Sequence, residues 1–559
     1  MADSLNLALA QLNPTVGDIA GNIELVRAAR REAAAQHADL VICPELVVTG
    51  YPPEDLVLKP RLQQVVAAAL ETLAQETADG GPALLVGAPV TIDGKLHNAA
   101  ILLDQGRQTA VRLKHDLPNY GVFDEKRVFV AGPLPGPISF RGARLGVMVC
   151  EDMWTPDVTE CLQESGADLL ISINGSPYEA GKGDERLNLA VARVVESKLP
   201  LIYVNQIGGQ DELVFDGASF ALNADANLRV QLAGWRPQIT CTRWQRGADG
   251  KFACVDQIVA PMVDGIEAIY HAMIAGLRDY VTKNRFPGVI LGLSGGIDSA
   301  LSAAVAVDAL GPDAVRAVMM PSPYTSQDSL DDAAECARLL GIRLDNISIG
   351  PAMQAFEAML KPLFEGRAPD ITEENLQSRA RGLTLMALSN KFGNMVLSTG
   401  NKSEMSVGYA TLYGDMCGGY AVLKDVYKTT VFELSTWRNQ HVPAGARGPA
   451  GRVMPERVIT KPPSAELKPD QTDQDTLPPY DQLDGILSCL IEQELGIAEI
   501  VAKGHDRATV ERVWRMLDRA EYKRRQAPPG VKITRRSFGR DRRYPITNGF
   551  VNSAAPPAE

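Results

Sequence analysis

The sequence predicts an α/β protein built from two different domains, and three observations lead to this prediction. Short apolar runs recur along the chain without alternating polar residues, which is typical of strands buried on both faces. Segments with the period of an amphipathic helix separate these runs. A glycine-rich turn at residues 292–299 joins a further buried strand to a further helix. Alternating strands and helices favour a doubly wound parallel sheet in that second half of the chain.

The first series of strands is expected within residues 1–245. Helical segments such as RLNLAVARVVESK lie between its apolar runs. Residues 215–234 indicate hairpins that close this domain, and a turn-rich stretch follows near residue 245. The predicted strands are LNLALAQL, ADLVICPE, ALLVGAP, RLGVMVC, ADLLISIN and LPLIYVN, at residues 5–12, 38–45, 83–89, 144–150, 167–174 and 199–205.

The second domain is expected at residues 266–551, after a linker at 246–265. It opens with an amphipathic helix and continues with alternating strands and helices. Residues 443–480 are rich in Pro, Gly and Asp, so we predict a mobile loop there that orders over the second site when substrates bind. The tail, residues 552–559, is predicted to be disordered. The predicted elements are helices at 266–283, 298–310 and a segment ending at 340, and strands at 288–294, 314–321 and 342–349.

The composition indicates a large cytoplasmic enzyme. The net charge of −12 argues against nucleic acid or an anionic membrane as the partner of the whole chain. Eight cysteines without a CxxC pair indicate reduced thiols rather than a disulfide framework or a zinc site. The N-terminus has neither the basic start nor the apolar core of a signal peptide, and no apolar run reaches transmembrane length.

Cys150 is a candidate nucleophile because it ends a predicted buried strand, where open α/β sheets place their ligands. The alternative is an inert core thiol, since most free cysteines are small buried hydrophobes. Two acidic neighbours raise the pKa of such a thiol, so it needs activation from elsewhere. Glu45 ends another strand and can serve as the base, while Lys114 can stabilise the developing oxyanion.

Three segments around these residues resemble the signatures of the nitrilase (carbon–nitrogen hydrolase) superfamily. They are CPELVVTGYPPED, KHDLPNYGVFDE and VCEDMW, and they occur in the family's order. The resemblance implies an α-β-β-α sandwich that hydrolyses amides through a thioester. It implies Glu45 as general base, Lys114 as oxyanion stabiliser and Cys150 as nucleophile. Glu125 corresponds to a second glutamate that orients the lysine or the attacking water.

The segment VILGLSGGIDSALSAAVAV predicts a strand, a glycine turn and a helix that together bind pyrophosphate. Gly295 and Gly296 allow a close approach to an anion, and the new helix offers free N–H groups. The lysine of a Walker loop is absent from this motif. Asp298 is poorly suited to direct phosphate binding, so a bridging Mg²⁺ is expected. The alternative is a simple helix cap after a strand.

The motif SGGIDS resembles that of the ATP-pyrophosphatases, which cleave ATP to AMP and pyrophosphate. Four further segments, at residues 373–390, 396–419, 461–475 and 521–534, resemble the NAD synthetases of that group. The resemblance implies ATP, deamido-NAD⁺ and Mg²⁺ as ligands, with Mg²⁺ held by Asp298 and Glu404. The implied ATP-binding residues are Gly292, Leu293, Ser294, Gly295, Gly296, Ile297, Asp298, Ser299 and Thr399, and the implied deamido-NAD⁺-binding residues are Asn375, Glu404 and Lys523.

The two resemblances together indicate the glutamine-dependent NAD synthetase family. One domain would release ammonia from L-glutamine, and the other would use it to amidate an adenylated deamido-NAD⁺. The family implies glutamine binding by Tyr120, Ser176 and Lys182 and a homo-oligomer. The basic run at residues 523–543 is interpreted as a phosphate-binding surface, with a solvated face and nonspecific nucleic-acid binding as alternatives.

Two other functions remain open at this stage. One is a nitrilase-type amidase whose second domain only senses a nucleotide, which would bind ATP without releasing pyrophosphate. The other is an amidotransferase that adenylates a different carboxylate. The segments at 373–419 and 521–534 disfavour the second alternative.

Overall fold

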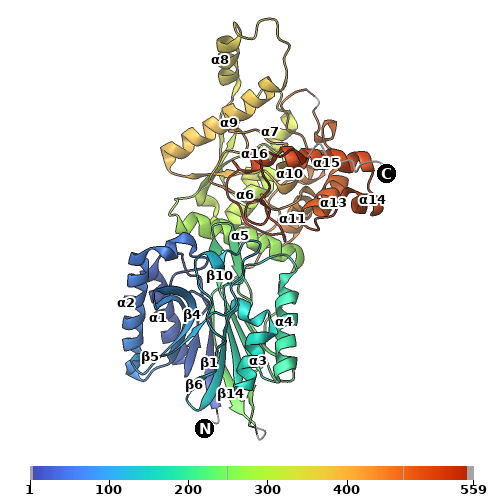
Figure 1. Cartoon of the computed structure of the whole chain (residues 1–559). Helices are drawn as coiled ribbons and strands as arrows, with labels where there is room; N and C mark the ends of the chain where they lie inside the picture. The colour runs from blue at the N-terminus through green and yellow to red at the C-terminus, as the bar shows by residue number, and fades with distance from the viewer. Residues whose placement is uncertain (1–3, 248–249, 470, 551–559) are drawn as a thin grey trace, which may run out of the picture. The chain divides into compact units, whose positions relative to one another are not determined.

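The computed structural model describes residues 4–247, 250–469 and 471–550, and the chain separates into two compact units, Met1–Asp264 and Gly265–Glu559 (Figure 1). Each unit is described by itself. The predicted disordered tail at 552–559 lies outside the described residues. Among the described helices, none is both long and apolar enough to cross a bilayer.

The first unit contains two seven-stranded sheets and a short hairpin. The first sheet has the order β15-β14-β1-β2-β3-β4-β5, and the second has the order β16-β13-β12-β9-β8-β7-β6. The strands are β1 (Ser4–Gln11), β2 (Leu40–Ile42), β3 (Ala83–Ile92), β4 (Lys95–Asp104), β5 (Arg107–Leu113), β6 (Ile138–Phe140), β7 (Ala143–Val149), β8 (Leu169–Asn174), β9 (Leu201–Asn205), β10 (Ile207–Gln210), β11 (Leu213–Asp216), β12 (Phe220–Leu222), β13 (Leu228–Gln231), β14 (Gln238–Arg246), β15 (Phe252–Cys254) and β16 (Ile258–Val259).

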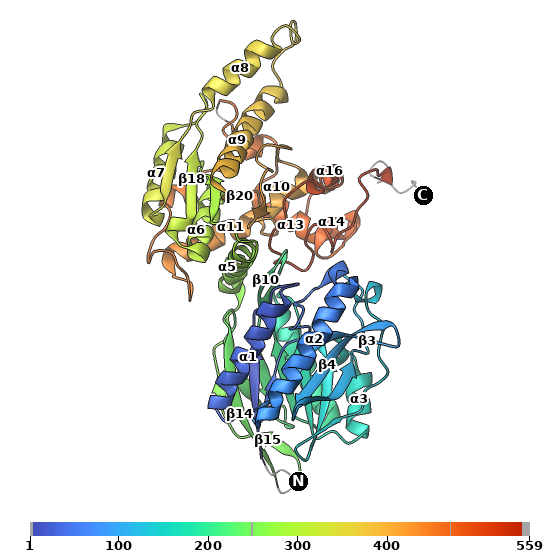
Figure 2. The ribbon, with the colours of Figure 1, turned by 90° about the vertical axis from the view of Figure 1, so that its left-hand side faces the viewer.

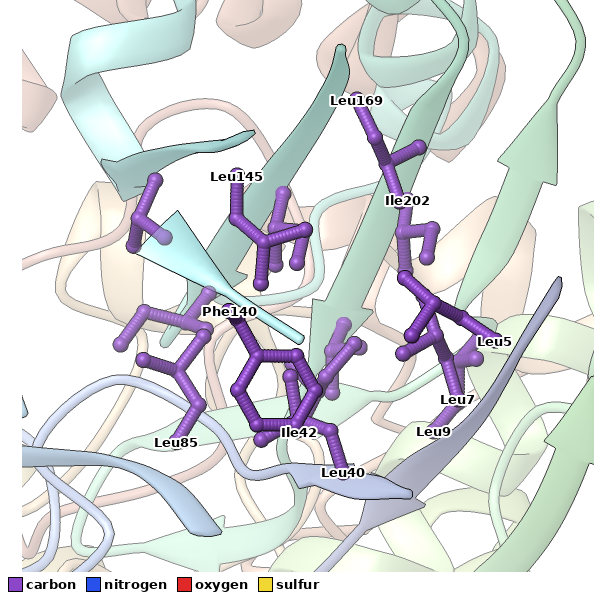
Figure 3. Close-up of a cluster of buried hydrophobic side chains, with 14 of the residues drawn as sticks. Leu5, Leu7, Leu9, Leu40, Ile42, Leu85, Phe140, Leu145, Leu169 and Ile202 are labelled. Carbon is purple, nitrogen blue, oxygen red and sulfur yellow. The ribbon is translucent and has the colours of Figure 1, made fainter. Parts of the chain in front are cut away.

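The two sheets pack face to face and form an α-β-β-α sandwich, which confirms the predicted fold. Side chains from both inner faces make one apolar core, including Leu7, Leu145 and Ile202 (Figure 3). Helices α1 (Ile19–Ala35) and α2 (Pro60–Glu76) cover the outer face of the first sheet. Helices α3 (Pro156–Glu164) and α4 (Lys182–Ser197) cover the outer face of the second. Burying both faces explains why the central strands are continuously apolar.

Each of the six predicted strands of this unit is present, although the first sheet also contains strands that the sequence did not indicate. The antiparallel strands β3, β4 and β5 form a meander at one end of that sheet. At the other end, β14 pairs antiparallel with all eight residues of β1. Residues 246–265, predicted as a linker, contain β15 and β16, which pair with β14 and β13.

The second unit is built on a five-stranded sheet of order β19-β18-β17-β20-β21 in which all neighbouring strands are parallel. The strand order reverses at β17, so the edge after β17 and β20 is a topological switch point, where such sheets bind ligands. The doubly wound parallel sheet is therefore confirmed. The strands are β17 (Val289–Gly292), β18 (Val315–Met319), β19 (Arg343–Asn346), β20 (Met395–Ser398) and β21 (Tyr420–Ala421).

Helices surround this sheet, and α8 and the start of α9 extend away from the rest of the unit in both views (Figures 1 and 2). The helices are α5 (Gly265–Lys283), α6 (Ile297–Leu310), α7 (Gln327–Leu340), α8 (Gly350–Leu360), α9 (Ile371–Phe392), α10 (Lys402–Val407), α11 (Lys428–Gln440), α12 (Glu456–Thr460), α13 (Tyr480–Ile491), α14 (Ile497–Ala502), α15 (Arg507–Arg519) and α16 (Glu521–Arg524); 3₁₀ turns lie at Glu54–Leu58, Thr77–Asp79, Glu125–Arg127, Cys150–Met153, Pro312–Ala314 and Asp473–Asp475.

The described part of segment 443–480 is more packed than its composition predicted. It contains α12 and a 3₁₀ turn, and Val453, Met454 and Val458 are buried. Glu466 accepts hydrogen bonds from the Ser326 and Ser329 hydroxyls at the start of α7. These contacts join the segment to α7.

Candidate functional site

In the first unit, Lys114 joins two buried carboxylates. Its Nζ donates to Glu45 Oε1 at 2.7 Å and to Glu125 Oε1 at 2.9 Å. Glu45 follows β2 and also accepts from Asn98 Nδ2 and from the Gly175 amide, each at 2.8 Å. Burial alone would lower the pKa of Lys114, but the two carboxylates outweigh it and raise that pKa well above its ordinary value. Lys114 is therefore a fixed cation at this site.

Cys150 begins the turn after β7 and has a left-handed backbone, with φ of 48°. A non-glycine residue in this region is strained, and such strain often marks a functional site. The thiol is 4% exposed. Burial and the Glu45 carboxylate raise its pKa well above the ordinary value, while Lys114 opposes them. The resting thiol is neutral, so nucleophilic attack requires a base.

Glu125 uses only one of its two carboxylate oxygens in hydrogen bonds. Oε1 accepts from Lys114 and from the Tyr51 hydroxyl, at 2.9 Å in each case. Oε2 is buried and has no hydrogen-bond partner within the described part of the chain. Burial raises the pKa of Glu125 to about 7, an effect that Lys114 partly offsets. A carboxylate with this pKa and a free oxygen can orient or deprotonate a water molecule near neutral pH.

Asp152, one of the two acidic residues near Cys150, accepts hydrogen bonds from three backbone amides. Its Oδ1 accepts from the His115 and Asp116 amides at 2.9 and 2.8 Å, and its Oδ2 accepts from the Val149 amide at 3.0 Å. Asp152 therefore ties the loop that carries Lys114 to the turn that carries Cys150. The sequence around Asp152 does not indicate this role.

The predicted glutamine-binding residues form a polar rim. The half-exposed Tyr120 donates its hydroxyl to Glu151 Oε1 at 3.0 Å. Lys182 is the first residue of α4. Its Nζ lies over the rings of Phe123 and Trp154, 5.6 and 5.7 Å from their centroids. The charge of Lys182 also reaches Glu151 and lowers its pKa, although burial raises that pKa more. This rim holds a carboxylate and an ammonium close together.

Ser176, the third predicted glutamine-binding residue, follows Gly175 directly. The Gly175 amide donates to Glu45, so Ser176 is the next residue after one that contacts the triad. Its own amide donates to Asn205 Oδ1 at 2.9 Å. Glu151 lies in the VCEDMW segment, but the sequence did not indicate its contact with Tyr120. Asn205, a partner of Ser176, was missed because it belongs to no recognised motif.

In the second unit, the glycine-rich turn lies between β17 and α6, at the switch point of the sheet. Gly295 has φ of 80°, and a Cβ at this position would lie 2.2 Å from the Ser329 carbonyl oxygen. The Ser294 and Ser299 hydroxyls contact each other at 3.1 Å. Only glycine fits at residue 295, because the backbone is left-handed and another chain segment touches it.

Asp298 and Glu404, the two predicted metal ligands, meet through Lys428. Lys428 Nζ donates to Asp298 Oδ2 and, at 3.2 Å, to Glu404 Oε1. Burial raises the pKa of Glu404 to about 8, and Lys428 partly offsets this rise. Burial would lower the pKa of Lys428, but Asp298 and Glu404 raise it above its ordinary value. Lys428 was missed, since it lies 24 residues after Glu404 and outside the recognised segment 396–419.

The donor set of this cluster fits a magnesium ion that arrives with phosphate groups. Two carboxylates supply hard oxygen ligands, and Mg²⁺ commonly takes its other ligands from phosphates and water. In the described part of the chain, no group of three or more His, Cys, Asp or Glu residues could hold a metal alone.

Two further predicted residues of this unit, Asn375 and Lys523, contact the segment that follows Glu404. Thr399 lies between β20 and α10. Asn375 Oδ1, on α9, accepts from the Thr411 hydroxyl at 3.0 Å. Lys523 Nζ, on α16, donates to the Gly408 and Ala410 carbonyls at 2.7 and 2.6 Å. Beside them lies a pocket whose lining includes Ser398, Gly400, Glu404, Ala410, Asp415 and Lys424.

Much of the charge in the basic run at 523–543 is neutralised inside the unit. Lys532 pairs with Asp541 at 3.1 Å, and Arg524 pairs with Glu521 at 2.8 Å. Arg542 lies 3.4 Å from Glu521. These side chains are buried, so they hold the C-terminal segment in place rather than forming a phosphate-binding surface. The exposed arginines of the run fit the solvated-face interpretation.

Two family models match the chain, one in each unit. The carbon-nitrogen hydrolase model matches residues 6–247. The NAD synthase model matches residues 269–527. Each match includes the clustered residues of its unit.

Curated relatives match along the whole chain. The glutamine-dependent NAD(+) synthetase of Rhodobacter capsulatus is 51% identical over 548 residues, which cover 98% of this chain and 99% of the relative. That of Acinetobacter baylyi is 47% identical over 551 residues, with coverage of 98% and 99%. A solved structure of the glutamine-dependent NAD⁺ synthetase from Acinetobacter baumannii with ADP is 45% identical, with a TM-score of 0.78 and coverage of 98% and 99%.

Proposed function

The chain belongs to the family of glutamine-dependent NAD(+) synthetases, and we propose that it makes NAD⁺ in one coupled reaction at its two sites. Deamido-NAD⁺, ATP, glutamine and water give NAD⁺, AMP, pyrophosphate and glutamate. The first unit releases ammonia from glutamine. The second unit converts the carboxylate of deamido-NAD⁺ to an adenylate, which the ammonia then attacks.

The first unit hydrolyses glutamine through Cys150. Glu45 takes the thiol proton, Sγ bonds to the side-chain amide carbon, and the proton passes to the departing ammonia. Lys114 stabilises the oxyanion, because its fixed charge lies in a buried environment where electrostatic interactions are strong. A water molecule, oriented by Glu125 and deprotonated by Glu45, then cleaves the thioester and releases glutamate. The free oxygen of Glu125 supports this role.

The polar rim recognises the amino-acid end of glutamine. At neutral pH this end is a zwitterion, so it needs an anionic and a cationic partner at short separation. Glu151 faces the α-ammonium and Lys182 faces the α-carboxylate. Tyr120 holds Glu151 in place through its hydroxyl, and Ser176 donates to the substrate from the opposite segment.

The second unit binds ATP at the switch point of its sheet. The glycine-rich turn and the N-terminus of α6 face the phosphates, as residues 292–299 predict. Asp298 and Glu404 would hold Mg²⁺, which when bound neutralises phosphate charge. Lys428 supplies a second positive charge between these carboxylates. Thr399 contacts ATP, while Asn375, Glu404 and Lys523 form the side of the site that takes deamido-NAD⁺.

One observation carries this proposal: each unit of a single chain holds its own buried cluster of charged side chains, matched by the family model for that half-reaction. The test is NAD⁺ formation from ATP, Mg²⁺ and deamido-NAD⁺, with glutamine or ammonia as donor. Cys150→Ala should lose glutamine-driven synthesis by at least a thousandfold and keep ammonia-driven synthesis. Cys43→Ala, which removes another buried thiol, is the matched control. If the wild type makes no NAD⁺ from either donor, the proposal is wrong.

The enzyme is further proposed to act as a homo-oligomer in the cytoplasm. All eight cysteines are free, as expected in a reducing compartment. Met359 on α8, Leu363 in the turn that follows it and Ile371 at the start of α9 are each more than 60% exposed. Large exposed apolar side chains favour association. Light scattering coupled to gel filtration measures the oligomeric state directly.

A further inference from the structure

Arg186, on α4, is a buried arginine with every N–H group engaged. Its Nη1 donates to both Asp216 oxygens at 2.7 and 2.9 Å. Its Nη2 donates to the Ser176 and Pro177 carbonyls at 3.0 and 2.6 Å, and its Nε donates to Ser176 Oγ at 3.1 Å. The residue is 3% exposed. Three of these five hydrogen bonds hold the segment that carries Ser176.

This arginine lies close to the reacting groups without belonging to the triad. It holds Ser176, whose neighbour Gly175 donates its amide to Glu45 at 2.8 Å. Burial would lower the pKa of Arg186, but the Asp216 carboxylate outweighs burial and raises that pKa. Asn205 holds the same segment from the other side, since it accepts from the Ser176 amide and donates to the Ser176 carbonyl at 3.1 Å. The backbone of Ser176 is therefore fixed between two buried side chains.

The contact to Ser176 Oγ also fixes the direction of the serine proton. A guanidinium can only donate, so the hydroxyl must accept from Arg186. The hydroxyl proton then points away from Arg186 and is available to an acceptor. Burial raises the pKa of Tyr203, and a hydrogen bond from the Ser176 hydroxyl lowers that pKa in part. A carboxylate or carbonyl oxygen of glutamine can take the place of Tyr203.

We propose that Arg186 is a positioning residue for glutamine binding, which orients the Ser176 hydroxyl as a hydrogen-bond donor to the substrate. This inference rests on the proposed glutaminase function of the first unit. Arg186 touches neither the thiol nor the reacting amide in this arrangement. Its removal should therefore weaken glutamine binding more than it slows the chemical step.

The experiment measures glutamate release from glutamine by the full-length enzyme as Arg186→Lys. Lysine keeps the charge but has three N–H donors in place of five, so it cannot replace all five hydrogen bonds of Arg186. We expect KM for glutamine to rise about fivefold to tenfold, the loss of one or two hydrogen bonds, with kcat within threefold of wild type. Ammonia-driven NAD⁺ synthesis should stay unchanged. Arg193→Lys is the control, because Arg193 is a buried arginine on the same helix that pairs with Glu196.

A double-mutant cycle with Ser176→Ala tests whether Arg186 affects glutamine binding through Ser176 or by stabilising the surrounding structure. If Arg186 acts through Ser176, the double variant should raise KM no further than the more affected single variant. Effects that multiply would overturn the inference, as would a fall in kcat at unchanged KM. If Arg186→Lys does not fold, Asp216→Asn carries the same test, since it loosens the guanidinium while keeping the arginine. A wild-type KM in Asp216→Asn would also overturn the inference.

The outcomes distinguish this inference from the proposed function. A wild-type enzyme that releases no glutamate from glutamine contradicts the proposed function itself. A wild-type enzyme that does so, with Arg186→Lys behaving like Arg193→Lys, contradicts only the role of Arg186.

Discussion

Asn401 Nδ2 donates to Asp298 Oδ1 across 2.8 Å, and this bond joins the start of α6 to the start of α10. Asn401 Oδ1 accepts from the Glu404 amide at 3.0 Å, so the same side chain caps the helix that carries Glu404. Asn401 is fully buried. One amide group thus sets the relative positions of the two carboxylates proposed to receive Mg²⁺.

Replacing Asn401 with Asp should damage the second site selectively. The new carboxylate can still accept the hydrogen bond from the Glu404 amide. Its other oxygen would replace the Nδ2 donor and lie next to the Asp298 carboxylate, and like charges at this distance repel. We expect ammonia-driven NAD⁺ synthesis to fall at least tenfold, or about 1.4 kcal/mol in barrier, while glutamine hydrolysis stays near wild type. Asn439→Asp, at a half-buried asparagine that caps other backbone amides of the same unit, is the control. Equal losses in both variants would contradict the specific role of Asn401.

Lys428→Met should remove the cation between Asp298 and Glu404 while preserving side-chain length. The pKa of Glu404, already raised by burial to about 8, should rise further because Lys428 no longer offsets the burial. Breaking a buried ion pair destabilises proteins by about 3–5 kcal/mol. We expect NAD⁺ synthesis to fall about a hundredfold and the second unit to unfold at lower denaturant. Lys283→Met, which removes a more exposed lysine from its pair with Asp279, should change NAD⁺ synthesis and stability less than Lys428→Met does. Wild-type synthesis in Lys428→Met would show that this lysine has no part in the reaction.

Much of the fold could be predicted from the sequence because the central strands of both units are buried on both faces. Such strands appear as continuous apolar runs, and β7, β8 and β17 were all expected near their observed positions. Strand β14 was not, because its pairing with β1 joins residues far apart in the chain. No local pattern records such a pairing. The packing of segment 443–480 was missed for a similar reason, as its apolar residues are scattered among prolines and glycines.

The candidate sites were predictable where a motif marks them and not where packing alone creates them. Glu45, Lys114 and Glu125 lie in recognisable segments, and the structure brings them into contact. Arg186 and Lys428 carry no local signal, because an arginine on an amphipathic helix normally faces solvent. Their burial follows from the tertiary arrangement, which places a carboxylate opposite each of them.

Glutamine hydrolysis should lose activity as the pH falls through about 7. Burial raises the pKa of Glu125 from 4.5 to about 7 in the folded enzyme, so this carboxyl gains a proton below that pH. A protonated Glu125 can no longer hold Lys114 and orient water as a carboxylate. We expect kcat/KM for glutamine to decline tenfold per pH unit below the midpoint. Glutamate release measured from pH 5.5 to 9 gives the profile. Glu125→Gln should be slower, and its kcat/KM should not decline as the pH falls through about 7. If that variant shows the same decline, the titrating group is a residue other than Glu125.

Gly295→Ala and Gly296→Ala should differ sharply, although the two glycines are adjacent. A Cβ on Gly295 would lie 2.2 Å from the Ser329 carbonyl oxygen, and the residue has φ of 80°. A Cβ on Gly296 would meet only the Ser294 hydroxyl at 3.3 Å, and its φ of −87° suits any residue. Because backbone cannot rotate away as a hydroxyl can, Gly295→Ala should destabilise the second unit by more than about 2 kcal/mol. Gly296→Ala should stay within about 0.5 kcal/mol of wild type. Urea unfolding of the two variants measures the difference, and equal midpoints would mean that the turn relaxes away from α7 at little energetic penalty.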